Sequence, residues 1–481
     1  MLPKLAAYAL SRLVFRCGER QRTLLLAAPT RIVGHLLFKI TMVAALLIRP
    51  LVRPFIEFFR REAASGIVLL ISAVLALVLA NTDWGPAHYF PVLWDQHLRL
   101  AVGSFVLDHT LLQWINDGLM TVFFLIVGLE IKREVLDGEL SSPRQAALPI
   151  AGALGGMLAP ALLFALLNHS TPTAGGWGIP MATDIAFALA VLQLLGARVP
   201  LGLKVFLTAL AIVDDLGAVL VIAGFYTKEL HLSFLYLALG TWGILLVFNW
   251  LRFRSLWAYL PLGFLLWYFM LESGIHATLA GVLLAIAIPF RIPFARLDLL
   301  RRLDERLALL REETHEYKAD PRVISEELED LHQRISSPAQ RLEHQLHSVV
   351  SFGIIPLFAF ANTSLVIETT ALHGLLSPLG LGIVLGLTVG KPLGIGLLSW
   401  LTVRLGWAAL PPGVSWKHLW AAGVLGGIGF TMSIFVTLLA LGESSPATKV
   451  AKLAILMASL VAGSLGYLLL SRTSTEPPAQ T

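Results

Sequence analysis

The chain has little charge and a single cysteine. Asp, Glu, Lys and Arg make up 14% of its 481 residues, whereas about a quarter of a soluble domain is charged. The lone Cys17 excludes an internal disulfide and a thiolate metal cluster. The HExxH and GxxxxGK[ST] patterns are absent, so a zincin site and a Walker A phosphate loop have no support. We therefore expect no cofactor.

Long apolar runs are abundant instead. Hydrophobic residues make up 56% of the chain, and the mean hydropathy is +0.76. A helix of about 20 apolar residues spans a bilayer, so the sequence predicts an all-α polytopic membrane protein. We expect about twelve spans, at residues 63–80, 112–130, 146–167, 178–195, 203–225, 233–250, 257–271, 275–290, 348–367, 379–401, 418–441 and 450–470.

Lys and Arg concentrate in alternate loops, which predicts the orientation because basic loops stay in the cytoplasm. Both termini are then cytoplasmic. Since these charges occupy short loops, the net charge of +5 does not indicate nucleic-acid binding. The basic loops carry Lys132, Arg133 and Arg144; Arg198 and Lys204; Arg252 and Arg254; and Arg404 and Lys417.

Composition also divides the chain into parts. Helical periodicity on both sides of Asp320-Pro321 favours an amphipathic hairpin in the long cytoplasmic loop, with a solvated charged linker as the alternative. Residues 84–111 predict an external hairpin or an interfacial helix. The parts are a basic cytoplasmic or interfacial extension (1–62), spans one to eight (63–290), the loop insertion (291–343), spans nine to twelve (344–470) and a tail (471–481).

Asp214 and Asp215 stand side by side within the fifth span. A carboxylate at the centre of a spanning helix costs about 2.5–3.5 kcal/mol, so water, a cation or a fixed positive group must meet the pair. Adjacent helical residues point about 100° apart, which gives the two acids different neighbours. A cation binding there would displace protons, and that competition is sufficient for exchange. The alternative is a short polar loop between two helices.

The fourth and eleventh spans carry interruptions. Pro180 frees backbone carbonyls beside Thr183 and Asp184, and irregular backbone at membrane depth must line a cavity or be buried in protein. In the eleventh span, Gly427 and Gly429 precede Thr431. Interrupted spans in corresponding positions of two halves indicate a transporter's binding site. Glycine-mediated helix packing is the alternative for the glycines.

Several charged residues need partners. Lys391 lies deep within the tenth span, where Asp214, Asp215 and Asp184 are the available acids; the alternative is a lysine that snorkels to a helix end.

Two clusters at cytoplasmic helix ends suit an entry funnel or proton sensor. His344 and His347 have metal-pair spacing, but a solvated face is favoured. The clusters are Glu130, Arg133 and Glu134 after the second span, and Glu343, His344 and His347 before the ninth.

Eight strings resemble the bacterial NhaA-type sodium/proton antiporters, and the resemblance covers roughly residues 55–470. Residues 1–50 and most of 292–337 have no counterpart in the compact form of that family. The strings are WINDGLM (114–120), VFFLIVGLEIKRE (122–134), ATDIAFA (182–188), AIVDDLGA (211–218), HATLAG (276–281), PLFAFAN (356–362), GKPLG (390–394) and GIGFTMSIF (427–435).

The resemblance implies inverted-topology repeats, with the fourth and eleventh helices interrupted and crossed. It implies that Asp215 is the main ligand of Na⁺, that Asp214 pairs with Lys391, and that Thr183 and Asp184 lie at the crossing. It assigns the Glu130 and Glu343 clusters to a pH response, and makes Asp117 a supporting carboxylate.

The implied activity is electrogenic, pH-regulated exchange of cytoplasmic Na⁺ or Li⁺ for external protons in the bacterial inner membrane. Each net charge moved is worth about 2.3 kcal/mol per 100 mV. The resemblance also implies a homodimer through residues 84–111. Two other classes remain open: an intramembrane aspartyl protease, which lacks its Gly-x-Gly-Asp string here, and a non-transporting membrane scaffold.

Overall fold

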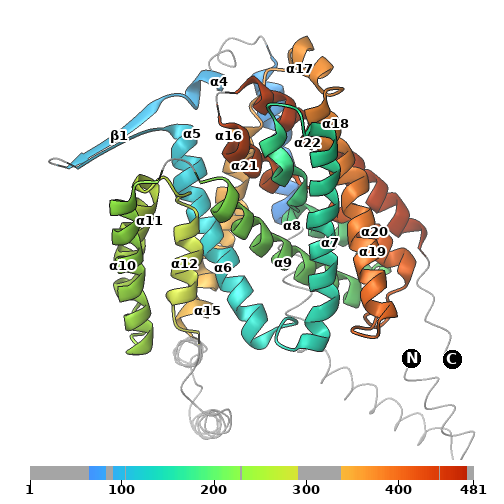
Figure 1. Cartoon of the computed structure of the whole chain (residues 1–481), viewed down its shortest axis with the longest axis horizontal. Helices are drawn as coiled ribbons and strands as arrows, with labels where there is room; N and C mark the ends of the chain where they lie inside the picture. Colours follow the sequence, from blue (N-terminus) through green and yellow to red (C-terminus); the bar gives the residue numbers. More distant parts are fainter. Residues whose placement is uncertain are drawn as a thin grey trace, which may run out of the picture. The chain divides into compact units, whose positions relative to one another are not determined.

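The structure is a computed structural model that describes residues 64–82, 90–102, 105–227, 230–290, 337–443 and 445–473. The expected N-terminal extension (1–62), most of the expected insertion (291–336) and the end of the tail (474–481) lie outside these residues. The described chain is mostly helical (Figure 1). It therefore agrees with the predicted class of helical polytopic membrane protein.

Eight helices of the described chain are long and apolar enough to cross a membrane, and a bent pair raises the number to nine. The eight run over Leu111–Asp137 (α5, η2 and α6), Pro143–Asn168 (α7), Ala174–Leu194 (η3 and α8), Leu201–Phe225 (α9), Leu232–Trp250 (α10), Pro338–Asn362 (α15, η5 and α16), Pro378–Arg404 (α18, η6 and α19) and Pro446–Arg472 (α22).

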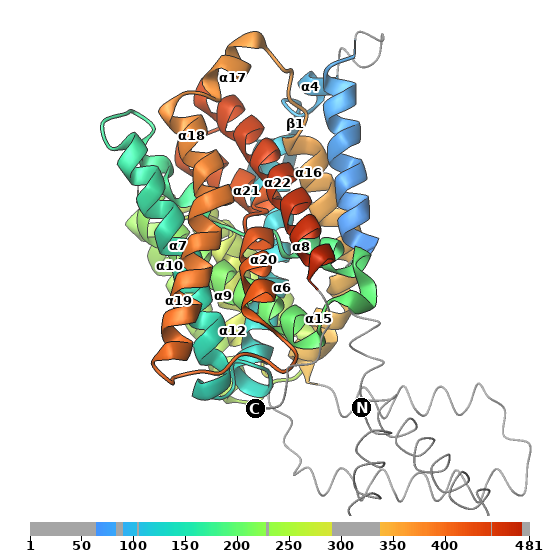
Figure 2. The ribbon, with the colours of Figure 1, turned by 90° about the vertical axis from the view of Figure 1, so that its right-hand side faces the viewer.

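The bent pair consists of α20 (Trp416–Gly426) and α21 (Phe430–Leu441), which meet at 44° (Figure 2). Two shorter apolar helices are Ala64–Ala80 and α11 (Leu256–Glu272), and α12 (Leu279–Ala287) is shorter still. Each of the twelve predicted apolar segments overlaps one of these helices.

The segment before α5 forms a two-stranded antiparallel hairpin. Strand β1 (His97–Val102) pairs with β2 (Phe105–Thr110), and a short helix α4 (Phe90–Leu93) precedes it. Figure 1 shows the hairpin projecting away from the helices. The indole of Trp114 donates a hydrogen bond to the carbonyl of Leu98 at 3.1 Å, which ties β1 to the following span. Of the two predicted alternatives for residues 84–111, the hairpin is the one observed.

Three spans contain a π-helical turn: η2 (Trp114–Leu119), η5 (Val350–Ile354) and η6 (Gly386–Gly390). Pro356 and Pro392 follow the last two by two residues. A proline inside a helix removes one backbone donor and its ring displaces the preceding turn, and π-turns gather at functional sites. The turn η6 ends at Gly390, and Lys391 is the first residue of α19.

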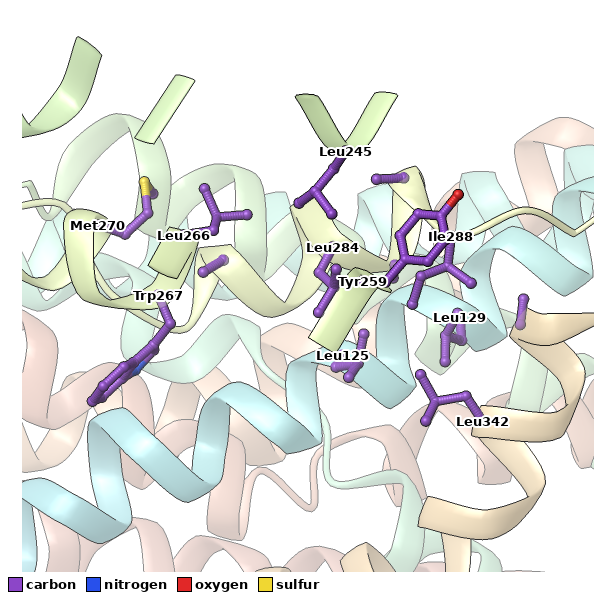
Figure 3. Close-up of a cluster of buried hydrophobic side chains, with 14 of the residues drawn as sticks. Leu125, Leu129, Leu245, Tyr259, Leu266, Trp267, Met270, Leu284, Ile288 and Leu342 are labelled. Atoms are coloured by element: carbon purple, nitrogen blue, oxygen red, sulfur yellow. The ribbon is translucent and has the colours of Figure 1, made fainter. Parts of the chain in front are cut away.

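A hydrophobic cluster joins α6, α10, α11, α12 and α15, and Figure 3 shows its side chains pointing toward one another. Tyr259 is fully buried in it and donates its hydroxyl to the carbonyl of Phe253 at 3.1 Å. Lys132 donates hydrogen bonds to the carbonyls of Ile286 and Ile288 at 2.7 and 2.6 Å. Because helix C-termini leave carbonyls unpaired, this lysine caps α12 and fixes it against α6.

Helices α7 and α19 lie side by side in backbone contact (Figure 1). A Cβ atom added at Gly155 would lie 2.0 Å from the carbonyl oxygen of Gly394, and one added at Gly394 would lie 2.0 Å from that of Gly155. Small residues allow such approach in membrane helices. The glycine pair therefore sets the position of the helix that carries Lys391.

We expect Gly394→Ala to lower the stability of the protein by about 1–3 kcal/mol, because overpacking forces the two backbones apart. Gly243→Ala in α10 is the matched control, since nothing lies within 4 Å of its added Cβ. Thermal unfolding of both variants in detergent would test this. Equal melting temperatures would show that the glycine contact is not limiting.

Candidate functional site

Asp214 and Asp215 lie at the middle of the unbroken helix α9, so the alternative of a polar loop at this position is wrong. Their exposed fractions are 1% and 2%. Asp214 lies thirteen residues after Leu201 along the helix, which places the acids about 20 Å from that end. The two carboxylates are therefore buried deep within a membrane-spanning helix and closed to bulk water in this conformation.

Lys391 is the charged partner of the first acid. Its ammonium nitrogen lies 2.8 Å from Oδ2 of Asp214, and neither side chain is more than 1% exposed. The same ammonium donates to the carbonyl oxygen of Met181 at the end of η3. Lys391 does not snorkel to a helix end, because it is fully buried. One ion pair thus connects α9, α19 and the first half of the broken fourth span.

The two adjacent acids each have one buried carboxylate oxygen with no hydrogen-bond partner among the described residues: Oδ1 of Asp214 and Oδ1 of Asp215. A buried charged oxygen without a partner is strongly unfavourable. The two acids are also adjacent in the chain, so their negative charges repel each other. An added proton or a small cation would relieve both effects, so the site has the chemistry of a place where either is held.

The fourth span is broken between η3 (Ala174–Met181) and α8 (Ile185–Leu194), at residues 182–184. Asp184 caps α8, with Oδ1 accepting from the backbone N–H of Phe187 at 3.0 Å. Its Oδ2 accepts from the backbone N–H and the hydroxyl of Thr431 at 3.1 and 2.6 Å. Helix N-termini carry partial positive charge, so this one carboxylate offsets those of α8 and α21 together.

The two interruptions are also joined through their backbones. The N–H of Asp184 donates to the carbonyl of Ile428 at 2.7 Å, and the hydroxyl of Thr183 donates to the carbonyl of Gly426 at 3.1 Å. Carbonyl and N–H groups that a break releases are unfavourable at membrane depth unless protein partners meet them. Here each break supplies partners for the other, which explains how two irregular segments persist in a buried position.

The glycines and the proline of the breaks permit close approach. A Cβ added at Gly427 would lie 2.3 Å from the carbonyl oxygen of Leu387, and one at Gly429 would lie 3.0 Å from the Leu387 side chain and 3.1 Å from the carbonyl oxygen of Ala182. Pro180 sits against Gly386 of η6, where an added Cβ would lie 2.7 Å from the proline ring. Helix packing therefore accounts for these glycines, while Asp184 and Thr431 supply the polar contacts.

The predicted cytoplasmic cluster is partly assembled. Arg133 of α6 forms ion pairs with Glu343 of α15 and, at 3.3 Å, with Glu134. Glu130 lies near enough to attract the same guanidinium, and His347 lies near Glu343. His344 is exposed. No group of three His, Cys, Asp or Glu able to hold a metal occurs in the described ranges.

Asp117 lies in the π-turn η2, at the opposite end of the α6 span from Arg133. Its backbone carbonyl accepts from the indole of Trp267 at 2.9 Å and from the hydroxyl of Thr121 at 2.5 Å. The structure therefore places this predicted supporting residue at a junction between α6 and α11, apart from the Lys391 ion pair.

Some contacts of the site have no signal in the sequence. The hydroxyl of Tyr226 donates to the carbonyl of Gly175 at 3.0 Å and accepts from the N–H of Gly178 at 3.1 Å. His276 in turn contacts the carbonyl of Tyr226 at 2.8 Å. These groups hold η3 against the end of α9, but a tyrosine that ends an apolar run is unremarkable in a sequence.

Buried acids, a paired lysine and two interrupted spans define the class as a helical membrane transport protein. A family model described as Na+/H+ antiporter 1 matches residues 56–470. The chain belongs to this Na⁺/H⁺ antiporter family, which confirms the resemblance noted in the sequence.

Curated relatives are similar over nearly their whole length. A protein of Oleidesulfovibrio alaskensis is 48% identical over 428 residues, which cover 87% of this chain and 94% of the relative. One of Acidithiobacillus ferrooxidans is 49% identical over 430 residues, which cover 88% and 98%. Both are named Na(+)/H(+) antiporter NhaA.

We expect Asp214→Asn or Lys391→Met alone to destabilise the protein by about 3–5 kcal/mol, because each leaves one buried charge unpaired. The double variant should be more stable than the sum of the two losses predicts. Chemical unfolding of the four proteins would measure this cycle. Strictly additive losses would mean that the two groups do not interact.

We expect Thr431→Val to cost about 1.5–3 kcal/mol, because it removes a hydrogen bond to a charged group. Thr437→Val is the matched control on the same helix, since its hydroxyl bonds only to the carbonyl of Ser433 within α21. Thermal unfolding compares the two. A loss of equal size in both variants would remove the special role of the Asp184 contact.

Proposed function

We propose that the protein is a secondary active transporter that exchanges Na⁺ or Li⁺ for protons at Asp214 and Asp215. The observation that carries this proposal is the buried acid pair, in which Lys391 holds one oxygen of Asp214 while two other oxygens lack partners. The names of its relatives, both Na(+)/H(+) antiporters, support the same activity.

Exchange follows from competition at this pair. A cation needs the negative charge of Asp215 and the free oxygen of Asp214, and protonation removes that charge. Because the two carboxylates are adjacent, their protonation is coupled. Asp215 is the principal ligand, Asp214 is shared between the cation and Lys391, and Thr183 and Asp184 stabilise the breaks beside them. Each load excludes the other, and the site opens to one side of the membrane at a time.

The twelve apolar helices form two inverted repeats, with η3–α8 and α20–α21 as the crossed, interrupted pair. The mutual hydrogen bonds between the breaks support this arrangement. The alternation of basic loops supports cytoplasmic termini in the bacterial inner membrane, with the extension 1–62 cytoplasmic or interfacial and the insertion 291–343 and the tail 471–481 cytoplasmic. Transport is electrogenic, with more protons entering than ions leaving.

The Arg133–Glu343 ion pair supports a pH-responsive entrance between α6 and α15. Glu130, Glu134, His344 and His347 belong to the same entrance. Because α6 carries Arg133 and also packs against α9, a rearrangement at the entrance can reach the ion site through these helices.

The hairpin β1–β2 supports a homodimer. A two-stranded sheet leaves both edges with unpaired N–H and C=O groups, which another strand readily completes. Leu98, Leu100 and Val106 are exposed on it. A second copy of the hairpin is the partner that satisfies both the edge and the apolar side chains.

The two alternative functions, an intramembrane aspartyl protease and a non-transporting membrane scaffold, have less support. An aspartyl protease needs two acids that share one water, whereas Asp214 is bound to Lys391 and Asp184 is bound to Thr431. Membership of an antiporter family confirms the expectation that the protein is not an enzyme. A scaffold would have no use for unpartnered carboxylate oxygens in the middle of a span.

We expect Asp215→Asn to abolish proton release when Na⁺ is added to everted vesicles that contain a pH dye, because the amide cannot alternate between cation and proton. Asp137→Asn is the matched control at the exposed end of α6. An undiminished dye response in Asp215→Asn would remove this residue from the mechanism.

A further inference from the structure

The described chain contains a second buried polar cluster, which the proposed ion site does not use. It consists of Asn116 in η2, Asn362 at the end of α16, Lys452 in α22 and Glu443 just after α21. We call these four residues the asparagine bridge. Three of them are buried, with exposed fractions of 4% for Asn116, 1% for Asn362 and 7% for Lys452, while Glu443 is exposed.

The bridge is a continuous hydrogen-bonded chain. The ammonium of Lys452 donates to Oδ1 of Asn362 at 3.3 Å. The amide nitrogen of Asn362 donates to Oδ1 of Asn116 at 2.9 Å. The amide nitrogen of Asn116 donates to Oε1 of Glu443 at 2.8 Å. A cation at the buried end is thereby linked to an anion at the surface through two amides.

Both amides point in the same direction along this chain. Each accepts from the side of the lysine and donates toward the glutamate, so their dipoles align with the field between the two charges. Hydrogen bonds in such a sequence polarise and strengthen one another. The orientation of each asparagine is also fixed by its neighbours, since a flipped amide would set donor against donor.

The bridge lies at the opposite end of the α6 span from the Arg133–Glu343 ion pair. Asn116 and Arg133 are separated by helix that rises about 25 Å. The bridge joins four segments there: the start of the α6 span, the end of α16, the segment after α21 and the first turns of α22. Separation of these segments is what an opening at this end of the molecule requires.

The acids are 1–2% exposed in this conformation, yet exchange needs access from each side in turn. We propose that the asparagine bridge is the latch that holds this end of the transporter shut, and that it breaks when the ion site opens toward this end. The reason for a latch to open and close rests on the proposed antiport, whereas the contacts that close this end are made by the bridge itself.

The chemistry of the bridge suits a contact that must break repeatedly. Buried hydrogen bonds add modest net stability because water replaces them once the site is wet. A buried lysine is unfavourable when dry, and entering water relieves that penalty. Asn116 also lies in a π-turn, which is less regular than the α-helix that follows. An apolar plug of the same size would lose contacts on opening and gain none.

The test measures closure directly with a cysteine. Cys17→Ser removes the native thiol, and Thr363→Cys places a new one beside Asn362 at a position that is 0% exposed. A membrane-impermeant maleimide is added to right-side-out or everted vesicles. We expect Lys452→Met and Glu443→Gln to speed labelling about tenfold from one side only, since loss of a charged hydrogen bond shifts a two-state equilibrium by about that factor.

Lys449→Met is the matched control. This residue lies on the same helix and pairs with Glu368 at 3.0 Å, but both side chains are about half exposed. It should label as slowly as the parent. Labelling of the Lys452 and Glu443 variants at the rate of the Lys449 control would overturn the latch.

A second variant and a second measurement guard against misfolding. Glu443→Gln keeps the shape of an exposed side chain and should fold even if Lys452→Met does not. Amide hydrogen exchange over residues 111–119 needs no cysteine, and it should quicken in the bridge variants and not in Lys449→Met; unchanged exchange would count against the latch.

The outcome is separable from that of the antiport proposal. Labelling requires no transport, so Asp215→Asn should lose ion exchange while the bridge variants in that background still label faster. Faster labelling without any transport in the parent protein would refute the antiport and leave the latch standing.

Discussion

The ion pair between Lys391 and Asp214 is the constraint on which the interior of this protein depends. Two opposite charges at the centre of a bilayer are tolerated only when each satisfies the other and further polar groups complete the set. The helices α9 and α19 must therefore approach closely, and the fourth span must end its first half where the carbonyl of Met181 meets the ammonium. The break in that span, the π-turn before Lys391 and the glycine contact with α7 all serve this one arrangement.

Asp184 offsets a second set of charges, the positive helix ends at the two breaks. Breaking two helices in a membrane exposes positive ends that need a counter-charge, and one carboxylate satisfies both. Asp215, by contrast, has a buried oxygen, Oδ1, without a hydrogen-bond partner among the described residues. Paired charges thus surround a carboxylate that has an oxygen without a partner, and in the proposed exchange this contrast lets an ion or proton be held there loosely and released.

The sequence predicted the positions of the helices and most of the residues that meet at the centre. Apolar runs reveal spans because the bilayer demands a fixed length, and charges within them are conspicuous because they are rare. The scarcity of acids at that depth limited the predicted partners of Lys391 to Asp214, Asp215 and Asp184, and only the family resemblance singled out Asp214. Other contacts were invisible, because the Met181 carbonyl, the Tyr226 hydroxyl and the Asn116–Asn362 pair involve backbone groups or neutral side chains whose partners lie up to 246 residues apart. The hairpin was one of two alternatives, since a short mixed segment has no distinctive period.

The contact of Gly155 with Gly394 has a consequence for how this molecule can move. Where helices touch through their main chains, no side chains lie between them that could slide or re-pack, so α7 and α19 form one rigid unit. Lys391 is part of that rigid unit. Any rearrangement that changes the side of the membrane to which the acids open must therefore move this pair of helices as a unit, and bending must occur elsewhere among the helices.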